Sequence, residues 1–514
     1  MATTEIKIGG RRVGPGSPVY FIAEAGSNHD GKLDQAKQLV DVAVDAGADA
    51  VKFQAFKAAN LYPKRAGQSE YLKDPRSIYD IIKSLEMPLE WIAPLAAYCE
   101  RRGIHFLCTP FDDQSADTLA PYVPAFKAAS YDMTNYPLLQ HIARKGKPLI
   151  VSTGTATMDE VEEMIAAVRT VGDPGLVVLQ CTAKYPAPLA ALNVRTVATM
   201  ARLGVLTGFS DHSREPLPGP LAAVALGAVI IEKHFTLSNG LPGPDHVYAL
   251  EPHELKDLIA KVRQVEAALG SGEKVVHAEE EELRTFARRT IFTSRAVAEG
   301  ERLRRSDLTV LRCGVLQYGL HPKEYLRLFG RPLRRAIPEE TAVRLDDLGP
   351  LALQDGDISL RLPERRDAAQ LMEWLGRPSA EGEQWFQTWT LESDRVDLVV
   401  EKASKPIGLV SIASVDSVAA RADFGVVLEA AGRDRDVARR ACALALDHAF
   451  QTLALCEVRQ AAASDEWTRE LSNDLGFAPL LEERRPGAAG EGKRAAPTAT
   501  LTAAGWAQSR PSDA

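Results

Sequence analysis

Short apolar runs recur eight times in the first half of the chain, and each is followed by a stretch with helical spacing. The runs have the length of buried strands and lie near residues 20–25, 50–54, 105–108, 125–129, 148–152, 176–181, 205–210 and 229–234. Eight strand–helix units within about 250 residues is the count of a (β/α)8 barrel. A doubly wound open sheet is the alternative, but it usually has fewer strands, and no G-x-G-x-x-G follows the first run. The sequence therefore predicts an α/β protein that begins with a TIM barrel.

The chain has 514 residues, which is too many for one ordinary core. We expect the barrel to occupy residues 1–272. Strand-like runs and turns predict a small β-rich domain at 273–353, and strands followed by a long helix predict an α+β domain at 354–483. The segment 484–514 is rich in Ala, Gly, Arg and Pro, so we expect a disordered tail.

Composition narrows the class of protein. A net charge of -8 and a pI near 5.8 give no sign of a nucleic-acid or anionic-membrane partner. No apolar run is long enough to span a bilayer, and the polar N-terminus lacks the apolar region of a signal peptide. The six cysteines are scattered without a C-x-x-C pair. We expect a cytoplasmic protein with reduced thiols.

Polar side chains gather where the predicted strands end, which is where barrel enzymes place their sites. The residues at these ends are Glu24, Lys52, Gln54, Thr109, Ser130, Asp132, Ser152, Lys184, Tyr185, Ser210, Asp211, His212, Glu232, Lys233 and His234. A barrel built only for stability would not need them. Their concentration indicates an enzyme.

Two histidines end neighbouring predicted strands. His212 and His234 could converge on one metal ion, and two imidazoles with oxygen ligands suit a divalent ion such as manganese. The alternative is two unrelated polar histidines. From the residues alone both interpretations stay open.

The other strand-end groups suit an anion and proton transfer. Lysine charges and hydroxyl donors could ring a phosphate, although any one serine could instead cap the next helix. The candidates are Lys52, Lys127, Thr109, Ser130, Ser152 and Ser210. Glu24 and Asp132 form a candidate acid/base pair, or else each pairs with a lysine.

Seven segments resemble the sialic acid (N-acetylneuraminate) synthase family. They are FIAEAGSNHDG at 21–31, AVKFQ at 50–54, CTPFD at 108–112, VSTG at 151–154, GFSDHS at 208–213, IEKHFT at 231–236 and GPDH at 243–246. The resemblance covers roughly residues 5–350 and implies a barrel followed by an antifreeze-like (SAF) domain. It implies that phosphoenolpyruvate condenses with an amino-sugar aldehyde, such as N-acetylmannosamine, and that phosphate is released. Which sugar is used, and so whether neuraminate, legionaminate or pseudaminate is made, stays open.

The resemblance also implies roles by position. His212 and His234 would hold Mn2+ or Mg2+, and Glu24 would be a catalytic carboxylate. Phosphoenolpyruvate would contact Lys52, Thr109, Lys127, Ser130, Ser152 and Ser210, and the sugar would contact Gln54, Tyr185 and Asp245. Arg312 would reach the partner subunit's site in a homodimer, with Phe286 lining the same pocket. Asp132 stands where many members have Glu, which is one methylene longer, so the exact role of this catalytic candidate stays open.

The third domain resembles a GNAT-type acetyltransferase, in which a long helix is followed by NDLGF at 473–477. That resemblance implies acetyl-CoA, whose pyrophosphate would bind the turn GRDRDVA at 432–438. Asp434 and Asp436 in this turn should repel an anion, which favours weak or absent binding. An active acetyltransferase and a structural domain both stay open. The sequence also predicts that synthase activity survives truncation after Leu353.

Two other functions remain in competition. A Schiff-base aldolase on a barrel would use free pyruvate and a lysine, for which Lys127 and Lys233 are candidates. A non-catalytic glycan-binding protein would bind sugar without releasing phosphate. The set of ionisable strand ends argues against the second.

Overall fold

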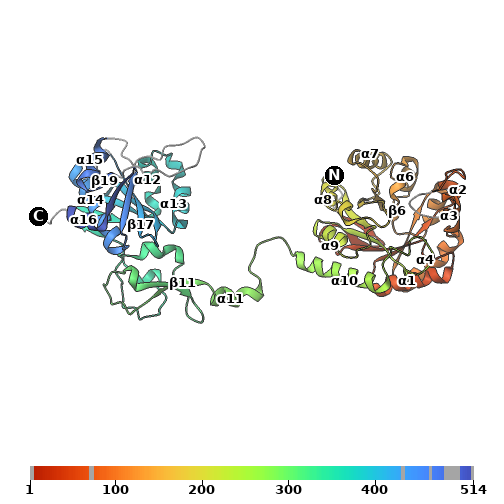
Figure 1. The fold of residues 1–514 in the computed structure, drawn as a ribbon, viewed down its shortest axis with the longest axis horizontal. Helices are drawn as coiled ribbons and strands as arrows, with labels where there is room; N and C mark the ends of the chain where they lie inside the picture. Colours follow the sequence, from red (N-terminus) through yellow and green to blue (C-terminus); the bar gives the residue numbers. More distant parts are fainter. Residues whose placement is uncertain (1–4, 69–74, 430–433, 462–465, 480–497, 511–514) are drawn as a thin grey trace. The chain divides into compact units, whose positions relative to one another are not determined.

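The computed structural model describes residues 5–68, 75–429, 434–461, 466–479 and 498–510 (Figure 1). The chain forms two compact units, Met1–Lys274 and Val275–Ala514. Among the described helices, none combines the length and the apolar character needed to cross a bilayer.

The first unit is a parallel barrel, as the sequence predicts. Its strands run in the spatial order β5-β4-β3-β10-β9-β8-β7-β6. Strands β5 and β6 at the two ends of this order are in contact, so the ring is nearly closed. The strands are β3 (Tyr20–Gly26), β4 (Ala50–Ala55), β5 (His105–Pro110), β6 (Phe126–Ala128), β7 (Leu149–Ser152), β8 (Leu176–Cys181), β9 (Leu206–Asp211) and β10 (Ile230–His234).

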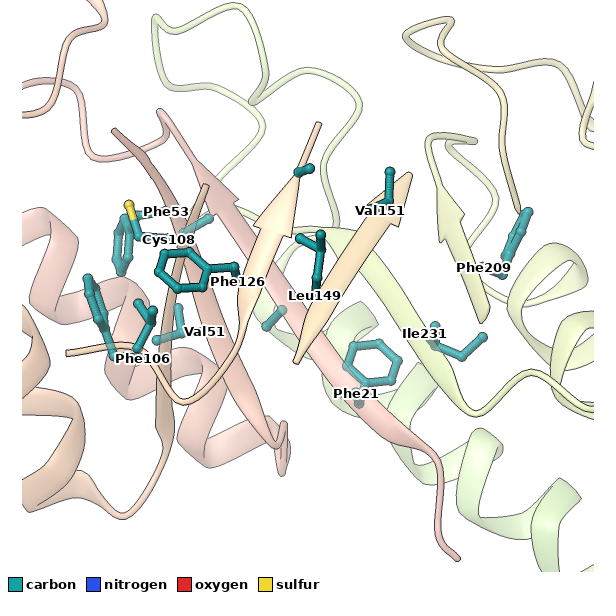
Figure 2. Packing of buried hydrophobic residues seen from close by; sticks show 14 of the residues in the cluster. Phe21, Val51, Phe53, Phe106, Cys108, Phe126, Leu149, Val151, Phe209 and Ile231 are labelled. Atoms are coloured by element: carbon teal, nitrogen blue, oxygen red, sulfur yellow. The ribbon is translucent and has the colours of Figure 1, made fainter. Parts of the chain in front are cut away.

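Helices surround these strands and bury the outward-facing strand residues. The longer helices are α1 (Leu33–Ala46), α4 (Ile92–Arg102), α6 (Tyr136–Ala143), α7 (Met158–Arg169), α9 (Pro218–Ala225) and α10 (Pro252–Leu269). The shorter ones are α2 (Ala58–Leu61), α3 (Ile78–Ser84), α5 (Asp113–Leu119) and α8 (Thr196–Met200). Figure 2 shows part of the resulting core, including Phe21, Phe53 and Phe126 on the strands. Because successive strand residues point to opposite faces, the alternate residues enter the barrel.

A separate apolar cluster fills the N-terminal end of the barrel interior. Ile22, Leu107 and Val177 belong to it, together with Ile6 and Ile8 from the N-terminal hairpin. The hairpin consists of β1 (Ile6–Ile8) and β2 (Arg11–Val13), which pair antiparallel. The barrel therefore has an apolar floor at this end, and polar groups can gather only at the other.

The second unit joins two regions. In the first, α11 (Glu281–Phe286) precedes an antiparallel pair, β11 (Arg289–Thr293) and β12 (Leu308–Arg312). The second is a sheet in the order β13-β14-β15-β16-β17-β18-β20-β19. Its strands are β13 (Leu353–Asp355), β14 (Ile358–Arg361), β15 (Val396–Lys402), β16 (Lys405–Asp416), β17 (Arg421–Leu428), β18 (Glu457–Ala461), β19 (Ala478–Pro479) and β20 (Thr498–Thr502). Its helices are α12 (Ala368–Trp374), α13 (Gly382–Leu391), α14 (Arg435–Asp447), α15 (Glu466–Asp474) and α16 (Ala503–Ser509).

The expected disordered tail is wrong for residues 498–509, which form β20 and α16. Strand β20 pairs with β18, and the buried Trp506 donates a hydrogen bond from Nε1 to Asp447 at 2.9 Å. Composition averaged over the tail concealed a short run that can bury Leu501 and Trp506. The other expected tail residues, apart from Arg510, lie outside the described residues.

Candidate functional site

An inner cavity of about 50 Å³ lies within the barrel, lined largely by residues at the carboxyl ends of its strands. It is lined by Glu24, Lys52, Gln54, Thr109, Phe111, Lys127, Ala129, Ser130, Ser152, Tyr185, Ser210, His212, Glu232 and His234. The strand register explains why such residues meet. Glu24 follows the buried Ile22 by two positions, so both point into the barrel.

Lys52 links the two carboxylates of the inner cavity. Its Nζ lies 2.8 Å from Glu24 and 3.6 Å from Glu232, and it donates a hydrogen bond to Thr109 at 3.2 Å. Gln54 donates a second hydrogen bond to Glu24 at 2.8 Å. All five side chains line the cavity, so these charges satisfy one another with little help from water.

Lys127 approaches Glu232 from the other side. Its Nζ lies 3.6 Å from Glu232 and donates a hydrogen bond to Ser152 at 2.7 Å. The hydroxyl of Ser210 donates to Glu232 at 2.7 Å. Glu232 therefore separates two buried ammonium groups that would otherwise repel each other.

The two carboxylates have opposite pKa shifts. Burial opposes ionisation of Glu232, but Lys127 and Lys52 outweigh it and hold the pKa of Glu232 well below its usual range. Burial raises the pKa of Glu24; Lys52 offsets only part of this, and the charge of Glu232 adds to the rise. Two acids whose environments separate their pKa values are suited to different roles. Glu232 is the permanent anion, and Glu24 can carry a proton.

The two predicted histidines meet at the rim of the inner cavity, with ring centroids 5.2 Å apart. His212 donates its Nδ1 hydrogen to the Thr182 carbonyl at 3.0 Å, because a carbonyl oxygen can only accept. In the neutral ring, Nε2 then keeps a lone pair. His234 has a buried Nδ1 without a partner, and burial lowers the pKa of His234 well below normal. A neutral imidazole such as that of His234 is what a metal ion binds.

A larger outer cavity, of about 580 Å³, shares Gln54, Tyr185 and His234 with the inner one. Its other lining residues are Ser27, Phe56, Tyr62, Ala66, Gln68, Ile78, Ile81, Ile82, Leu85, Tyr131, Pro244, Asp245 and Tyr248. Asp245, predicted to face a sugar, is therefore close to the predicted Gln54 and Tyr185. Burial raises the pKa of Asp245.

Asp132, whose pairing with Glu24 stays a prediction, lies in the turn that follows β6. It ends a 3-10 turn, Ser130–Asp132, and it is not among the residues that line either cavity. Burial raises the pKa of Asp132 to about 6. The second carboxylate of the inner cavity is Glu232, which lies on a strand and not in the turn after one.

Glu232 is the residue to which sequence reasoning assigned no role. The signal was present, because Glu232 precedes His234 by two positions and so shares its face of β10. The intervening Lys233 points the other way and pairs with Asp211 at 2.7 Å. It lines neither cavity, which removes one of the two lysines of the aldolase hypothesis.

Phe286 and Arg312 belong to the second unit and lie at the same end of the β11–β12 pair. The backbone N–H of Gly314 donates to the Phe286 carbonyl at 2.9 Å, and that of Cys313 to the Arg288 carbonyl at 3.0 Å. Both Phe286 and Arg312 are exposed. The structure thus brings together the two residues that the resemblance assigned to one pocket.

Family comparisons match three consecutive regions. Residues 39–274 match the NeuB family, 288–349 the SAF domain, and 344–469 an acetyltransferase (GNAT) domain. No set of three His, Cys, Asp or Glu side chains that could hold a metal ion occurs within the described part of the chain.

Several curated relatives resemble the first two regions. The spore coat polysaccharide biosynthesis protein SpsE of Bacillus subtilis is 43% identical over 361 residues, which are 66% of this chain and 96% of that protein. The N,N'-diacetyllegionaminic acid synthase of Legionella pneumophila is 40% identical over 63% of this chain and 93% of its own length. The human N-acetylneuraminate-9-phosphate synthase is 32% identical over 65% and 94%.

Solved structures agree with these matches. The N-acetylneuraminic acid synthetase of Leptospira borgpetersenii, solved with citrate, has a TM-score of 0.50 and 33% identity, covering 55% of this chain and 96% of that one. The putative spore coat polysaccharide biosynthesis protein E of Chromobacterium violaceum has a TM-score of 0.52 and 26% identity, covering 65% and 100%.

Replacing Glu232 by Gln should destabilise the barrel, because it leaves Lys52 and Lys127 without the anion between them. We expect a loss of about 3–5 kcal/mol in the free energy of unfolding, measured by urea denaturation at low salt. Inorganic phosphate should stabilise the variant more than the parent. The control is Glu215→Gln at an exposed position, where a change within about 0.5 kcal/mol is expected. Equal stability of the Glu232→Gln variant and the parent would contradict this account.

Proposed function

The chain belongs to the NeuB family, and we propose that it condenses phosphoenolpyruvate with an open-chain amino-sugar aldehyde to form a nonulosonic acid and phosphate. The observation that carries this proposal is the inner cavity. It combines two buried lysines, four serine or threonine hydroxyls and two carboxylates with separated pKa values. Relatives whose names state that they are synthases of legionaminic, pseudaminic and neuraminic acids support it.

The residues of the inner cavity fit the parts of this reaction. Lys52 and Lys127, with the nearby hydroxyls, would hold the phosphate and carboxylate of phosphoenolpyruvate. The methylene carbon of phosphoenolpyruvate attacks the aldehyde carbon of the sugar, which leaves positive charge at the pyruvyl C2. The permanent anion Glu232 would stabilise that charge. Water then adds to C2, and Glu24 takes one of its protons and passes it to the oxygen of the former aldehyde. Phosphate leaves with cleavage of its bond to C2, and the remaining hydroxyl proton goes with it as the C2 carbonyl forms.

We propose that His212 and His234 hold a divalent metal ion. The unpartnered Nδ1 of His234, and the Nε2 lone pair left on His212 by its Thr182 hydrogen bond, fit such an ion. Imidazole ligands favour manganese over magnesium, which prefers oxygen. When bound, the ion would polarise the aldehyde carbonyl as a Lewis acid.

The outer cavity narrows the choice of sugar. Ile78, Ile81 and Ile82 of α3 give it an apolar wall, and among the described residues no lysine or arginine lines it. A phosphorylated sugar would need such cations. We propose an unphosphorylated sugar with apolar substituents, such as a 2,4-diacetamido-2,4,6-trideoxyhexose, as the preferred substrate. N-acetylmannosamine is the second candidate.

Phosphate release tests the function and the sugar together. Incubation with phosphoenolpyruvate and Mn2+ should release phosphate with the diacetamido-trideoxyhexose. The rate constant kcat/KM should be about tenfold lower for N-acetylmannosamine, because a hydroxyl replaces a buried apolar group. N-acetylmannosamine 6-phosphate should give no reaction, and a chelator should stop all turnover.

Each outcome of these assays distinguishes the proposed reaction from one alternative function or substrate. Release only with the 6-phosphate sugar would contradict the proposed sugar and leave the condensation intact. No release with any of the three sugars would contradict the condensation itself. Borohydride trapping of pyruvate on Lys127 would instead support the aldolase.

We propose that the protein is a homodimer in which Arg312 acts at the partner subunit's site. Exposed apolar side chains surround Arg312, and a patch of this kind marks an interface. They include Phe286, Leu311, Val315 and Leu316.

Mixing two inactive variants tests the arrangement in trans. Arg312→Ala and His212→Ala should each lose activity alone. After subunit exchange about a quarter of the activity should return, because half of the dimers are mixed and each has one intact site. The control is His212→Ala mixed with His234→Ala, which leaves no site intact. If exchange is confirmed and no activity returns, Arg312 does not act across the interface.

The GNAT-like region is proposed to bind acetyl-CoA weakly or not at all. The Asp434 side chain accepts a hydrogen bond from the Asp436 N–H at 2.9 Å, so it occupies the helix end where pyrophosphate would bind. Arg435 and Arg440 are engaged by the carboxylates of Asp474 and Asp355. Gly432 and Arg433 of the same turn lie outside the described residues.

Calorimetry of the full chain with acetyl-CoA tests this proposal. No binding in the micromolar range is expected, because the carboxylate at the helix end opposes an incoming anion. The variant Asp434→Gly should bind more tightly than the parent if that carboxylate is the cause. Micromolar affinity in the parent would overturn the proposal.

The state of the thiols supports a cytoplasmic location, which we propose. All six cysteines are free, and five of them are buried. Unpaired thiols persist in a reducing compartment.

A further inference from the structure

Arg327 joins the SAF region to the acetyltransferase-like region. It lies on the 3-10 helix Pro322–Leu328, and its side chain is only 4% exposed. The guanidinium donates hydrogen bonds to the carbonyls of Trp389 and Glu392, each at 2.5 Å. It also lies over the Trp389 ring, 4.4 Å from the centroid. A cation from one region is thus buried in the other.

The acceptors lie at the carboxyl end of helix α13, which needs such a partner. The last carbonyls of a helix have no partner within it and carry partial negative charge. Helix α13 has no basic residue in its own last turn. Arg327 supplies a donor to the Glu392 carbonyl, a second donor to the Trp389 carbonyl, and the positive charge that the helix end lacks. The fully buried carboxylate of Asp397 adds negative charge nearby, and Arg327 and Arg395 both offset the rise in its pKa that burial causes.

A single apolar core continues across the same junction. Leu328 and Phe329 belong to one buried cluster with Leu398 and Cys442 of the acetyltransferase-like region. The absence of a side chain at Gly330 makes room for a buried histidine, because a Cβ there would lie 3.1 Å from the ring of His448. Both ring nitrogens of His448 are buried without a hydrogen-bond partner, so the ring contributes to this core by packing alone. The junction between the two regions therefore has the buried apolar packing of a domain core, which a linker lacks.

We infer that the acetyltransferase-like region of this chain is a scaffold that stabilises the SAF region. Without it, Phe329 and Leu328 would be exposed and Arg327 would lose its acceptors. The inference runs against the prediction from sequence that synthase activity survives truncation after Leu353. It does not depend on acetyl-CoA or on the proposed reaction.

The protein's own thiols report on each region. Cys313 lies in the SAF region, Cys442 in α14, and Cys99 and Cys108 in the barrel, and all four are buried. In the full chain, pulses of alkylating reagent at rising urea concentration, read by mass spectrometry, follow their exposure. We expect Cys313 and Cys442 to become reactive in one shared transition. Reaction of Cys313 while Cys442 stays protected, or the reverse, would overturn the inference.

The variant Arg327→Met tests the anchor. At a fixed urea concentration, labelling of both Cys313 and Cys442 should rise at least tenfold, because the α13 carbonyls lose their donor. Labelling of Cys99 in the barrel should not change. The matched control is Arg366→Met, an exposed arginine paired with its neighbour Glu364. A rise confined to Cys442 would show that the two regions are separable.

Truncation after Leu353 provides a second test. Cys313 should then react without urea, while Cys99 and Cys108 stay protected and show that the barrel is folded. If Cys313 remains protected in the truncated chain, the scaffold is unnecessary and the inference fails. Failure of the condensation proposal would leave this test unaffected, because thiol exposure requires no substrate.

Discussion

Two ammonium groups and two carboxylates share a space from which water is nearly excluded, and this constraint organises the barrel. Charges without water must satisfy one another, so Lys52, Lys127, Glu24 and Glu232 have to converge from four strands. The parallel register supplies that convergence, because it pairs Glu24 with Lys52 across β3 and β4. The chemical difference between the two carboxylates follows from the same arrangement. Glu232 faces both lysines and Glu24 faces one.

The barrel and most of its site could be predicted because both depend on local periodicity. Apolar runs of strand length gave all eight strands, and their polar ends gave the lining of the inner cavity. Prediction was weaker where the direction of a side chain mattered more than the position of its residue in the sequence. Asp132 follows β6 in a turn whose Ser130 lines the inner cavity, whereas Asp132 lines neither cavity. Glu232 was visible at a strand end, but its importance comes from lysines on two other strands.

The second unit was harder to predict because its stability comes from contacts between distant residues. Arg327 and Trp389 are 62 positions apart, and neither has a local pattern that indicates the other. The same holds for Trp506, which reaches Asp447 from a segment whose composition suggests disorder. Periodicity shows which face of an element is apolar. It does not show which distant face covers it, and so the joint between the SAF and acetyltransferase-like regions could not be seen in the sequence.

The hairpin beneath the barrel also limits the depth of the site. Ile6 and Ile8 take part in the apolar floor, and the inner cavity shares three lining residues with the outer one. The two cavities are therefore neighbours with a common wall, formed by Gln54, Tyr185 and His234. A substitution at any of these three residues changes both spaces at once, so the binding of two substrates cannot be altered separately there.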